Sequence, residues 1–232
     1  MYGKQLGEIE INNQKIRVQT SDKYNIYQRI KDKNIIKNII IDKDIIVETR
    51  PIYPLYYPKY TTQFILCKTD KLLIKPNSEI QIYGNMMIDL AIYTIYNNNF
   101  NIIDIIPLHS MYKLVLYGTQ QHGTIARYCN LKLTNKESYK KGYVMIPIKI
   151  RNETRNIREI SKILIDASPL KIFYKKGTWI ARTQDIEVNI LSSSTAIVLY
   201  GKGPQKGFEQ LEDPPELRPP RLLNRSDMMW GY

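Results

Sequence analysis

Apolar and polar residues alternate along most of the chain with a period of two, which is typical of half-buried strands. Residues 8–11 and 16–18 alternate on either side of Asn12 and Asn13, so we predict a hairpin there. The same pattern recurs at 72–74, 80–83, 88–96, 113–117, 124–133, 144–150, 186–191 and 196–200, with Gly, Pro, Asn and Ser at the turn positions between them. Residues 152–161 are the best helical candidate, and a strand fits them nearly as well. We therefore predict an all-β fold.

Three of the predicted strands end in Tyr-Gly, at residues 83–84, 117–118 and 200–201. Residues 72–84 align with residues 189–201 without gaps, although the identities are few and chance is an alternative. We interpret the match as a tandem duplication of two β-sandwich or barrel-like domains. The predicted organisation is a domain at 1–105, a basic domain at 106–203 and an extended tail at 204–232.

The tail contains five of the twelve prolines, which favour an extended backbone. It also contains more bulky apolar residues than a disordered segment normally has. We expect it to dock on the chain's own second domain or on a neighbouring subunit. The residues expected to make this contact are Arg218, Arg221, Leu222, Leu223, Arg225, Met228, Met229, Trp230 and Tyr232.

Composition bounds the class of protein. No apolar run approaches the roughly 20 residues that a membrane-spanning helix needs, and the N-terminus has no hydrophobic signal core. We therefore expect a soluble, cytoplasmic protein. Cys67 and Cys129 are interpreted as two reduced, buried thiols, or as one bridge if the source is a hyperthermophile. His109 and His122 are too few for a convincing zinc site, so no metal is predicted.

Positive charge is concentrated in one window of the sequence. The net charge is +12, and residues 140–182 hold eleven basic residues against three acidic ones, which is +8. Such clustering indicates a surface for an anionic partner, the alternative being an ordinary solvated face. The predicted nucleic-acid contacts are Lys149, Arg151, Arg155, Arg158, Lys162, Lys171, Lys175, Lys176 and Arg182.

Catalytic patterns are weak. The loop at 118–123, with His122 near Cys129, is better interpreted as a turn beside a core cysteine, because its spacing matches no nucleophilic motif. The carboxylates of Asp166, Asp185 and Glu187 could pair in a site, but we interpret them as solvated acids at strand edges. The tyrosines between Arg50 and Tyr60 could stack on bases, but capping of a domain core is the favoured interpretation. We predict no catalytic residue and no cofactor.

Three stretches resemble a known family. They are Met1-Tyr2-Gly3, Phe173–Gly177 with Ala181–Asp185, and Arg218-Pro219-Pro220-Arg221 with Met228–Gly231. The chain resembles, over its whole length, an archaeal family called domain of unknown function four hundred and thirty-two. The resemblance implies an archaeal source and no activity.

Three function hypotheses follow. The first is a non-enzymatic binding protein for an anionic partner, namely RNA or a ribonucleoprotein such as a ribosomal subunit. The second is a self-assembling structural protein, a homo-oligomer whose tail latches a neighbouring subunit. The third is an enzyme of unknown class, for which we would expect a deep pocket lined by polar groups.

Overall fold

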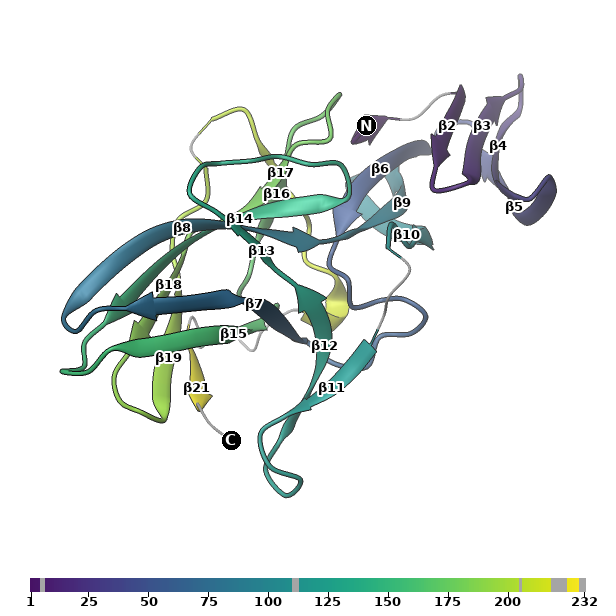
Figure 1. Cartoon of the computed structure of the whole chain (residues 1–232). Coiled ribbons are helices and arrows are strands. Elements are labelled where there is room, and N and C mark those ends of the chain that lie inside the picture. Colours follow the sequence, from purple (N-terminus) through teal and green to yellow (C-terminus); the bar gives the residue numbers. More distant parts are fainter. Residues whose placement is uncertain (5–6, 110–112, 205, 218–224, 230–232) are drawn as a thin grey trace.

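A computed structural model describes residues 1–4, 7–109, 113–204, 206–217 and 225–229 (Figure 1). Strands dominate this part of the chain, and it contains no α-helix and one short 3-10 helix, η1 (Pro215–Leu217). The predicted all-β class is confirmed. The strands form four sheets, which we call the N-terminal, hairpin, front and large sheets.

The N-terminal sheet is an antiparallel meander of four strands in chain order: β2 (Gly7–Ile11), β3 (Gln14–Thr20), β4 (Tyr24–Lys31) and β5 (Asn34–Asp42). Asn12 and Asn13 make the first turn with φ angles of 47° and 59°. Asn tolerates this left-handed conformation better than most residues, and the predicted hairpin is confirmed. The sheet protrudes from the rest of the molecule (Figure 1).

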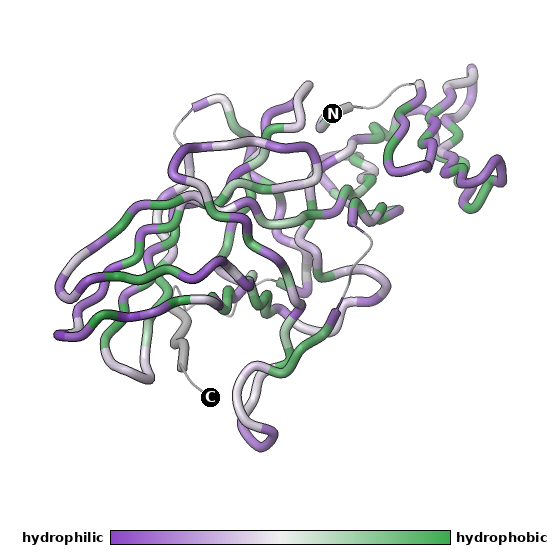
Figure 2. Tube along the Cα trace, in the orientation of Figure 1, coloured by the Kyte–Doolittle hydropathy of each residue, from purple (hydrophilic) through white to green (hydrophobic). Residues whose placement is uncertain are grey.

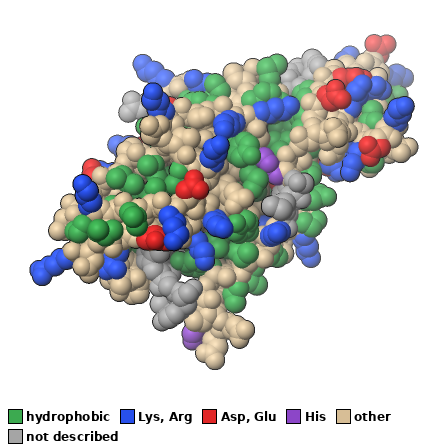
Figure 3. All heavy atoms as spheres, in the orientation of Figure 1, with side chains coloured by type: hydrophobic (Ala, Val, Ile, Leu, Met, Phe, Trp, Pro, Cys, Tyr) green, Lys and Arg blue, Asp and Glu red, His purple; other side chains and the backbone are tan. Residues whose placement is uncertain are grey.

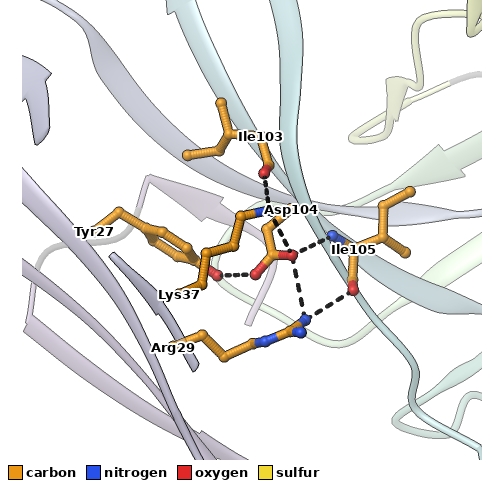
Figure 4. Close-up of polar contacts among 6 residues, drawn as sticks. All are labelled: Tyr27, Arg29, Lys37, Ile103, Asp104 and Ile105. Atoms are coloured by element: carbon orange, nitrogen blue, oxygen red, sulfur yellow. Dashed lines mark hydrogen bonds and ion pairs between the residues drawn. The ribbon is translucent and has the colours of Figure 1, made fainter. Parts of the chain in front are cut away.

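The hairpin sheet has the order β1 (Gly3–Lys4), β6 (Ile46–Ile52), β9 (Asp89–Tyr96) and β10 (Asn99–Ile106). A polar cluster on β10 joins it to the N-terminal sheet (Figure 4). Asp104 accepts a hydrogen bond from the Tyr27 hydroxyl at 2.7 Å and pairs with Arg29 and Lys37, each at 3.2 Å. The Asp104 side chain is 6% exposed. Buried carboxylates persist only with such partners, so this cluster fixes how the meander docks.

The other two sheets form the body of the molecule. The front sheet has the order β11 (Lys113–Tyr117), β12 (Thr124–Asn130), β7 (Phe64–Ile74) and β15 (Arg158–Asp166). The main path of the large sheet is β20 (Glu209–Gln210), β16 (Ile172–Tyr174), β17 (Ala181–Thr183), β14 (Tyr143–Asn152), β18 (Ile186–Ile190), β19 (Thr195–Tyr200) and β21 (Arg225–Met229). β8 (Ser78–Met87) joins it beside β14, and β13 (Lys132–Thr134) pairs with β8.

The front sheet packs over the large sheet as a β-sandwich (Figure 1). Residues 65–67 on β7 and residues 163–165 on β15 are all buried, so these two strands are covered on both faces here. Figure 2 shows that hydrophobic and hydrophilic stretches both occur along the strands of this body. Removal of these side chains from water is the main driving force for the fold.

Strand pairing crosses the predicted boundary at residues 105 and 106. β7 pairs with β12 and β15, and β8 pairs with β13 and β14, all of which come after that boundary. The boundary therefore does not divide the strands into two separately paired sets. Pairing between distant strands leaves no local signal in the sequence. The domain boundary was predicted from local patterns and therefore could not take this pairing into account.

The two aligned segments, residues 72–84 and 189–201, differ in strand pairing. β18 and β19 are antiparallel neighbours, whereas β7 and β8 belong to different sheets. The strand pairing therefore does not show the tandem duplication that the match suggested. The helical interpretation of residues 152–161 is also wrong, because β14 ends at Asn152 and β15 begins at Arg158. The strand alternative is correct only for the ends of this stretch, since residues 153–157 connect the two strands.

The C-terminal segment adds to both ends of the large sheet. β20 pairs with β16, and the Leu211 and Leu217 side chains are buried. β21 pairs with β19 of the same chain from Thr195↔Met229 to Leu199↔Arg225. The other predicted tail contacts, Arg218, Arg221, Leu222, Leu223, Trp230 and Tyr232, lie outside the described residues.

Candidate functional site

The structure separates the nine predicted nucleic-acid contacts. Five of them are ion-paired: Lys149 with Glu79, Arg151 with Glu79 and Glu187, Lys171 with Asp213, Lys176 with Glu48 and Glu209, and Arg182 with Glu137 and Asp185. These carboxylates reduce the positive potential that the sequence window implies. Arg155 and Arg158 lie at the start of β15 or just before it, and the Lys175 ammonium lies over the Phe208 ring. Lys162 is exposed on β15.

Lys162 belongs to a different cationic surface, which the sequence did not indicate. Lys68 on β7 lies directly opposite Lys162 in the antiparallel register. Like charges in directly opposed positions are destabilising, so local stability does not account for this pair. Neither lysine has an ion pair with a described acid. Asn130 on β12 continues the row as the parallel partner of Lys68.

The row leads to two further exposed lysines. The Leu131 amide donates a 2.8 Å hydrogen bond to the Lys68 carbonyl, which places Lys132 next to the row. Lys140 follows in the segment between β13 and β14, and neither cation is ion-paired within the described chain. We call Lys68, Lys132, Lys140 and Lys162 the lysine strip. Figure 3 shows blue side chains gathered on this face over the region of β7, β12 and β15.

A cavity of about 420 Å³ opens at the end of the lysine strip. We call it the Asn85 cavity. It is lined by residues from β8, β12, β13 and β14 and from the segments before β11 and β14: Asn85, Met87, His109, Asn130, Lys132, Lys140 and Tyr143. Its volume lies within the range of small-ligand sites. No Asp or Glu is among these lining residues.

Strand register explains why these residues meet. Asn85 on β8 is the partner of Lys132 on β13, and Met87 is the partner of Tyr143 on β14. Asn85 and Met87 are two positions apart, so their side chains leave the same face of β8. One face therefore presents a carboxamide, a thioether, a phenol ring and an ammonium group side by side.

The Asn85 side chain is unusual because its carboxamide is buried without a hydrogen bond. The residue is 1% exposed, and neither Nδ2 nor Oδ1 has a hydrogen-bond partner. Burying a polar group without a partner costs about 1–3 kcal/mol, so such groups are rare and need an explanation. A ligand that offers one donor and one acceptor would satisfy both atoms of the carboxamide.

His109 also lines the Asn85 cavity. A 2.7 Å hydrogen bond joins its Nε2 atom to the Gly142 carbonyl, and its ring meets the Tyr143 ring edge-on at 4.9 Å between centroids. Because the carbonyl can only accept, Nε2 carries the proton. This hydrogen bond orients the ring. Aromatic and thioether groups on the same wall suit a planar ligand.

The sequence could not indicate this site, because its residues are spread from position 68 to position 162. Asn85 stands beside Met86 and Met87 in an otherwise unremarkable strand. Lys68 and Lys132 lie outside the basic window. A polar residue in a buried strand between Gly84 and Met86 was the only available signal, and it gains meaning only from the missing hydrogen bonds.

A second cavity, of about 1010 Å³, lies between the β9–β10 hairpin and the segment at 212–216. Tyr56, Tyr93 and Phe100 are among its lining residues, together with Glu212 and Glu216. Its acidic lining makes it unsuitable for an anionic partner. It is the kind of polar cavity that the enzyme hypothesis requires, but the residues that line it form no nucleophile–base pair.

The tyrosines at 53–60 mostly contact protein. Tyr53 is buried and its hydroxyl donates to the Leu170 carbonyl, whereas Tyr57 is 39% exposed. The Tyr56 and Tyr60 rings pack together at 5.4 Å between centroids. The preferred interpretation, in which these tyrosines cap a core, fits this arrangement better than base stacking.

The weak catalytic candidates have structural surroundings. Asp166 accepts a 2.9 Å hydrogen bond from the Ser168 amide, and Asp185 and Glu187 are in the ion pairs given above. Cys67 and Cys129 are free, buried and directly opposed on parallel strands, which agrees with two reduced thiols. Among the described residues, no group of three or more His, Cys, Asp and Glu side chains could hold a metal ion. None of the described helices is long and apolar enough to cross a membrane.

Comparison with protein families identifies the class of the chain. Residues 1–229 match the model of a family described as protein of unknown function DUF432. The chain belongs to this family, and the resemblance drawn from the sequence is confirmed. No curated protein matches the chain. No solved structure matches it either.

Proposed function

We propose that this chain is a non-enzymatic binding protein for an anionic polymer, and that the polymer is RNA, free or within a ribonucleoprotein such as a ribosomal subunit. The lysine strip carries the proposal. It sets two cations directly opposite each other and leaves four without a described acidic partner. Phosphates would relieve that repulsion, and the net charge of +12 would attract them over a distance.

This proposal moves the contact surface from the one that the sequence predicted. Lys162 remains, and Lys68, Lys132 and Lys140 replace the ion-paired Lys149, Arg151, Lys171, Lys176 and Arg182 as the main phosphate contacts. Arg155, Arg158 and Lys175 stay as predicted contacts of lower weight. A cytoplasmic location and an archaeal source also stay predictions.

The test is the salt dependence of RNA binding. If the four lysines each neutralise one phosphate of a single strand, log K should fall with log salt with a slope of about −3. The paired substitution of Lys68 and Lys162 by Ala should reduce the magnitude of that slope by about 1.4. Lys31→Ala on the N-terminal sheet is the matched control and should change neither slope nor affinity. Binding that is independent of salt, or no binding to any RNA, would contradict the proposal.

Self-assembly through the tail is the second candidate. β21 occupies the edge of β19 within the same chain, which favours docking in cis over a latch on a neighbour. A defined oligomer in the absence of nucleic acid, measured by light scattering, would favour self-assembly instead.

A further inference from the structure

We propose that the Asn85 cavity binds one nucleotide, holding the base through the Asn85 carboxamide and the phosphate through Lys132 and Lys140. This inference rests on the proposed function and adds a ligand class to it. It predicts recognition of a base, whereas the lysine strip alone would bind any phosphate chain.

The carboxamide specifies the hydrogen-bonding part of the ligand. Asn85 offers a donor at Nδ2 and an acceptor at Oδ1, and both lack partners although the residue is 1% exposed. Nucleobase edges present neighbouring donors and acceptors, and Asn pairs with adenine in this bidentate way in nucleic-acid complexes. A phosphodiester or a carboxylate has no donor at neutral pH and could satisfy only Nδ2.

The walls specify a planar, partly apolar ligand. Met87 and Tyr143 are cross-strand partners beside Asn85, and the Tyr143 ring is held edge-on by His109. Bases in single strands are commonly held against aromatic side chains, which contribute to binding whatever the base. A volume of about 420 Å³ leaves space for a single nucleotide.

The cations specify an anionic end. Lys132 is the strand partner of Asn85, so its ammonium group reaches the same cavity from the rim. Lys140 lines another part of the cavity, and both side chains are exposed to solvent. The base would thus point inward and the phosphate outward, toward Asn130 and the Lys68–Lys162 pair.

The occupant could be a free mononucleotide or one residue of an RNA strand, because both have the same chemistry. Titration calorimetry on the full chain with adenosine, AMP and inorganic phosphate, and with short homopolymers of each base, separates these sources. Occupation by RNA predicts that one homopolymer binds at least about tenfold tighter than the others and that free AMP binds more weakly than that homopolymer. Occupation by a metabolite predicts AMP binding that is not improved by chain length.

Asn85→Leu is the decisive variant, since leucine has a similar size and no hydrogen-bonding atoms. It should remove an unsatisfied group, so we expect its melting temperature to equal or exceed that of the parent. It should abolish the preference among bases while retaining salt-dependent binding to all homopolymers. Lys132→Ala, at an exposed position, should weaken AMP about tenfold and leave adenosine binding unchanged.

The outcomes distinguish the two proposals. If Asn85→Leu keeps the parent's base preference, or if neither mononucleotides nor any homopolymer shows a preference with the parent chain, the nucleotide site is wrong. The lysine strip would then still be tested by its salt slope. If neither RNA nor AMP binds at all, both proposals fail together.

Discussion

The Tyr27 hydroxyl donates a 2.7 Å hydrogen bond to Oδ2 of Asp104, 77 residues away in the sequence. Arg29 and Lys37 approach Oδ1 of the same carboxylate. One carboxylate on the hairpin sheet thus holds three side chains of the meander (Figure 4). The N-terminal sheet has a separate meander topology, and this contact is a main determinant of its position.

Asp104→Asn should therefore release the N-terminal sheet from the body. The substitution leaves Arg29 and Lys37 without their counter-charge, and loss of one partner of a buried pair costs about 3–5 kcal/mol. We expect a lower urea midpoint and faster amide hydrogen exchange in residues 7–42. Glu8→Gln, which removes surface pairs with Lys15 and Arg17, is the control and should leave the midpoint nearly unchanged. Equal effects of the two substitutions would contradict this account.

Lys68→Glu should have opposite effects on stability and on binding. It converts the Lys68–Lys162 opposition into an attractive cross-strand pair, which should add about 0.2–1 kcal/mol to the free energy of unfolding. The same change should weaken RNA binding by reversing a charge in the lysine strip. Chemical denaturation and RNA titration measure the two effects. A variant that is less stable and binds unchanged would show that the pair has no role in phosphate binding.

Alkaline pH should destabilise the chain through its buried tyrosines. Burial raises the pKa of several tyrosines above the ordinary value of about 10, most strongly for Tyr2, Tyr27, Tyr53, Tyr56, Tyr93 and Tyr174. Above about pH 10 the unfolded chain loses these protons and the folded chain keeps them, so the folded state binds more protons and stability falls as pH rises. Each tyrosine can contribute up to about 1.4 kcal/mol per pH unit in this range.

Urea midpoints measured on both sides of about pH 10 check this expectation. Tyrosinate absorbance of the folded protein should rise less than that of the unfolded chain over the same range. Tyr53→Phe removes one buried phenol and should reduce the pH dependence. A flat stability profile across this range would contradict the prediction.

Cys67 and Cys129 should be inert toward hydrophilic thiol reagents in the folded state. A hydrogen bond with Cys129 and burial raise the pKa of the Cys67 thiol, and the thiolate is the reactive form. Both thiols should react only as fast as the protein unfolds, and the rate should rise with added urea. Stoichiometric labelling within the mixing time under native conditions would show that this part of the sandwich opens locally.

Truncation after Leu217 should lower the melting temperature, because it removes β21 and leaves β19 as an uncovered edge. An open strand edge is a template for pairing with another chain. We therefore also expect concentration-dependent association of the truncated chain by light scattering. A truncated chain with unchanged melting temperature and mass would mean that β21 contributes little to the large sheet.

The local part of the fold could be predicted from the sequence, and the pairing could not. Period two located β2, β3, β9, β14 and β18 because side chains on a half-buried strand must alternate. The partners of β7 are β12 and β15, and nothing near residues 64–74 indicates either of them. β7–β8 and β18–β19 have similar apolar patterns, which suggested a duplication. Such a pattern indicates which residues are buried, but it does not indicate which strands pair.

The candidate site was missed for the same reason. Counting charge along the sequence favours windows such as 140–182, but Glu79 and Glu48 come from the first half of the chain and neutralise part of that window. Lys68 and Lys162 are 94 positions apart by number and become neighbours only through the β7–β15 register. Asn85 indicates a binding site only through the missing hydrogen bonds of its carboxamide, which the sequence does not reveal.

The placement of β21 also has a consequence for biosynthesis. β18 and β19 leave the ribosome well before residues 225–229, so a growing chain carries an open β19 edge until its own later segment arrives. A chain that stops early, or that a protease clips in the connecting segment, keeps that edge. Cellular chaperones and proteases act on such exposed features. Chains synthesised past residue 229 can therefore cover the β19 edge with β21, whereas shorter chains leave it open. This difference exists before any ligand is bound.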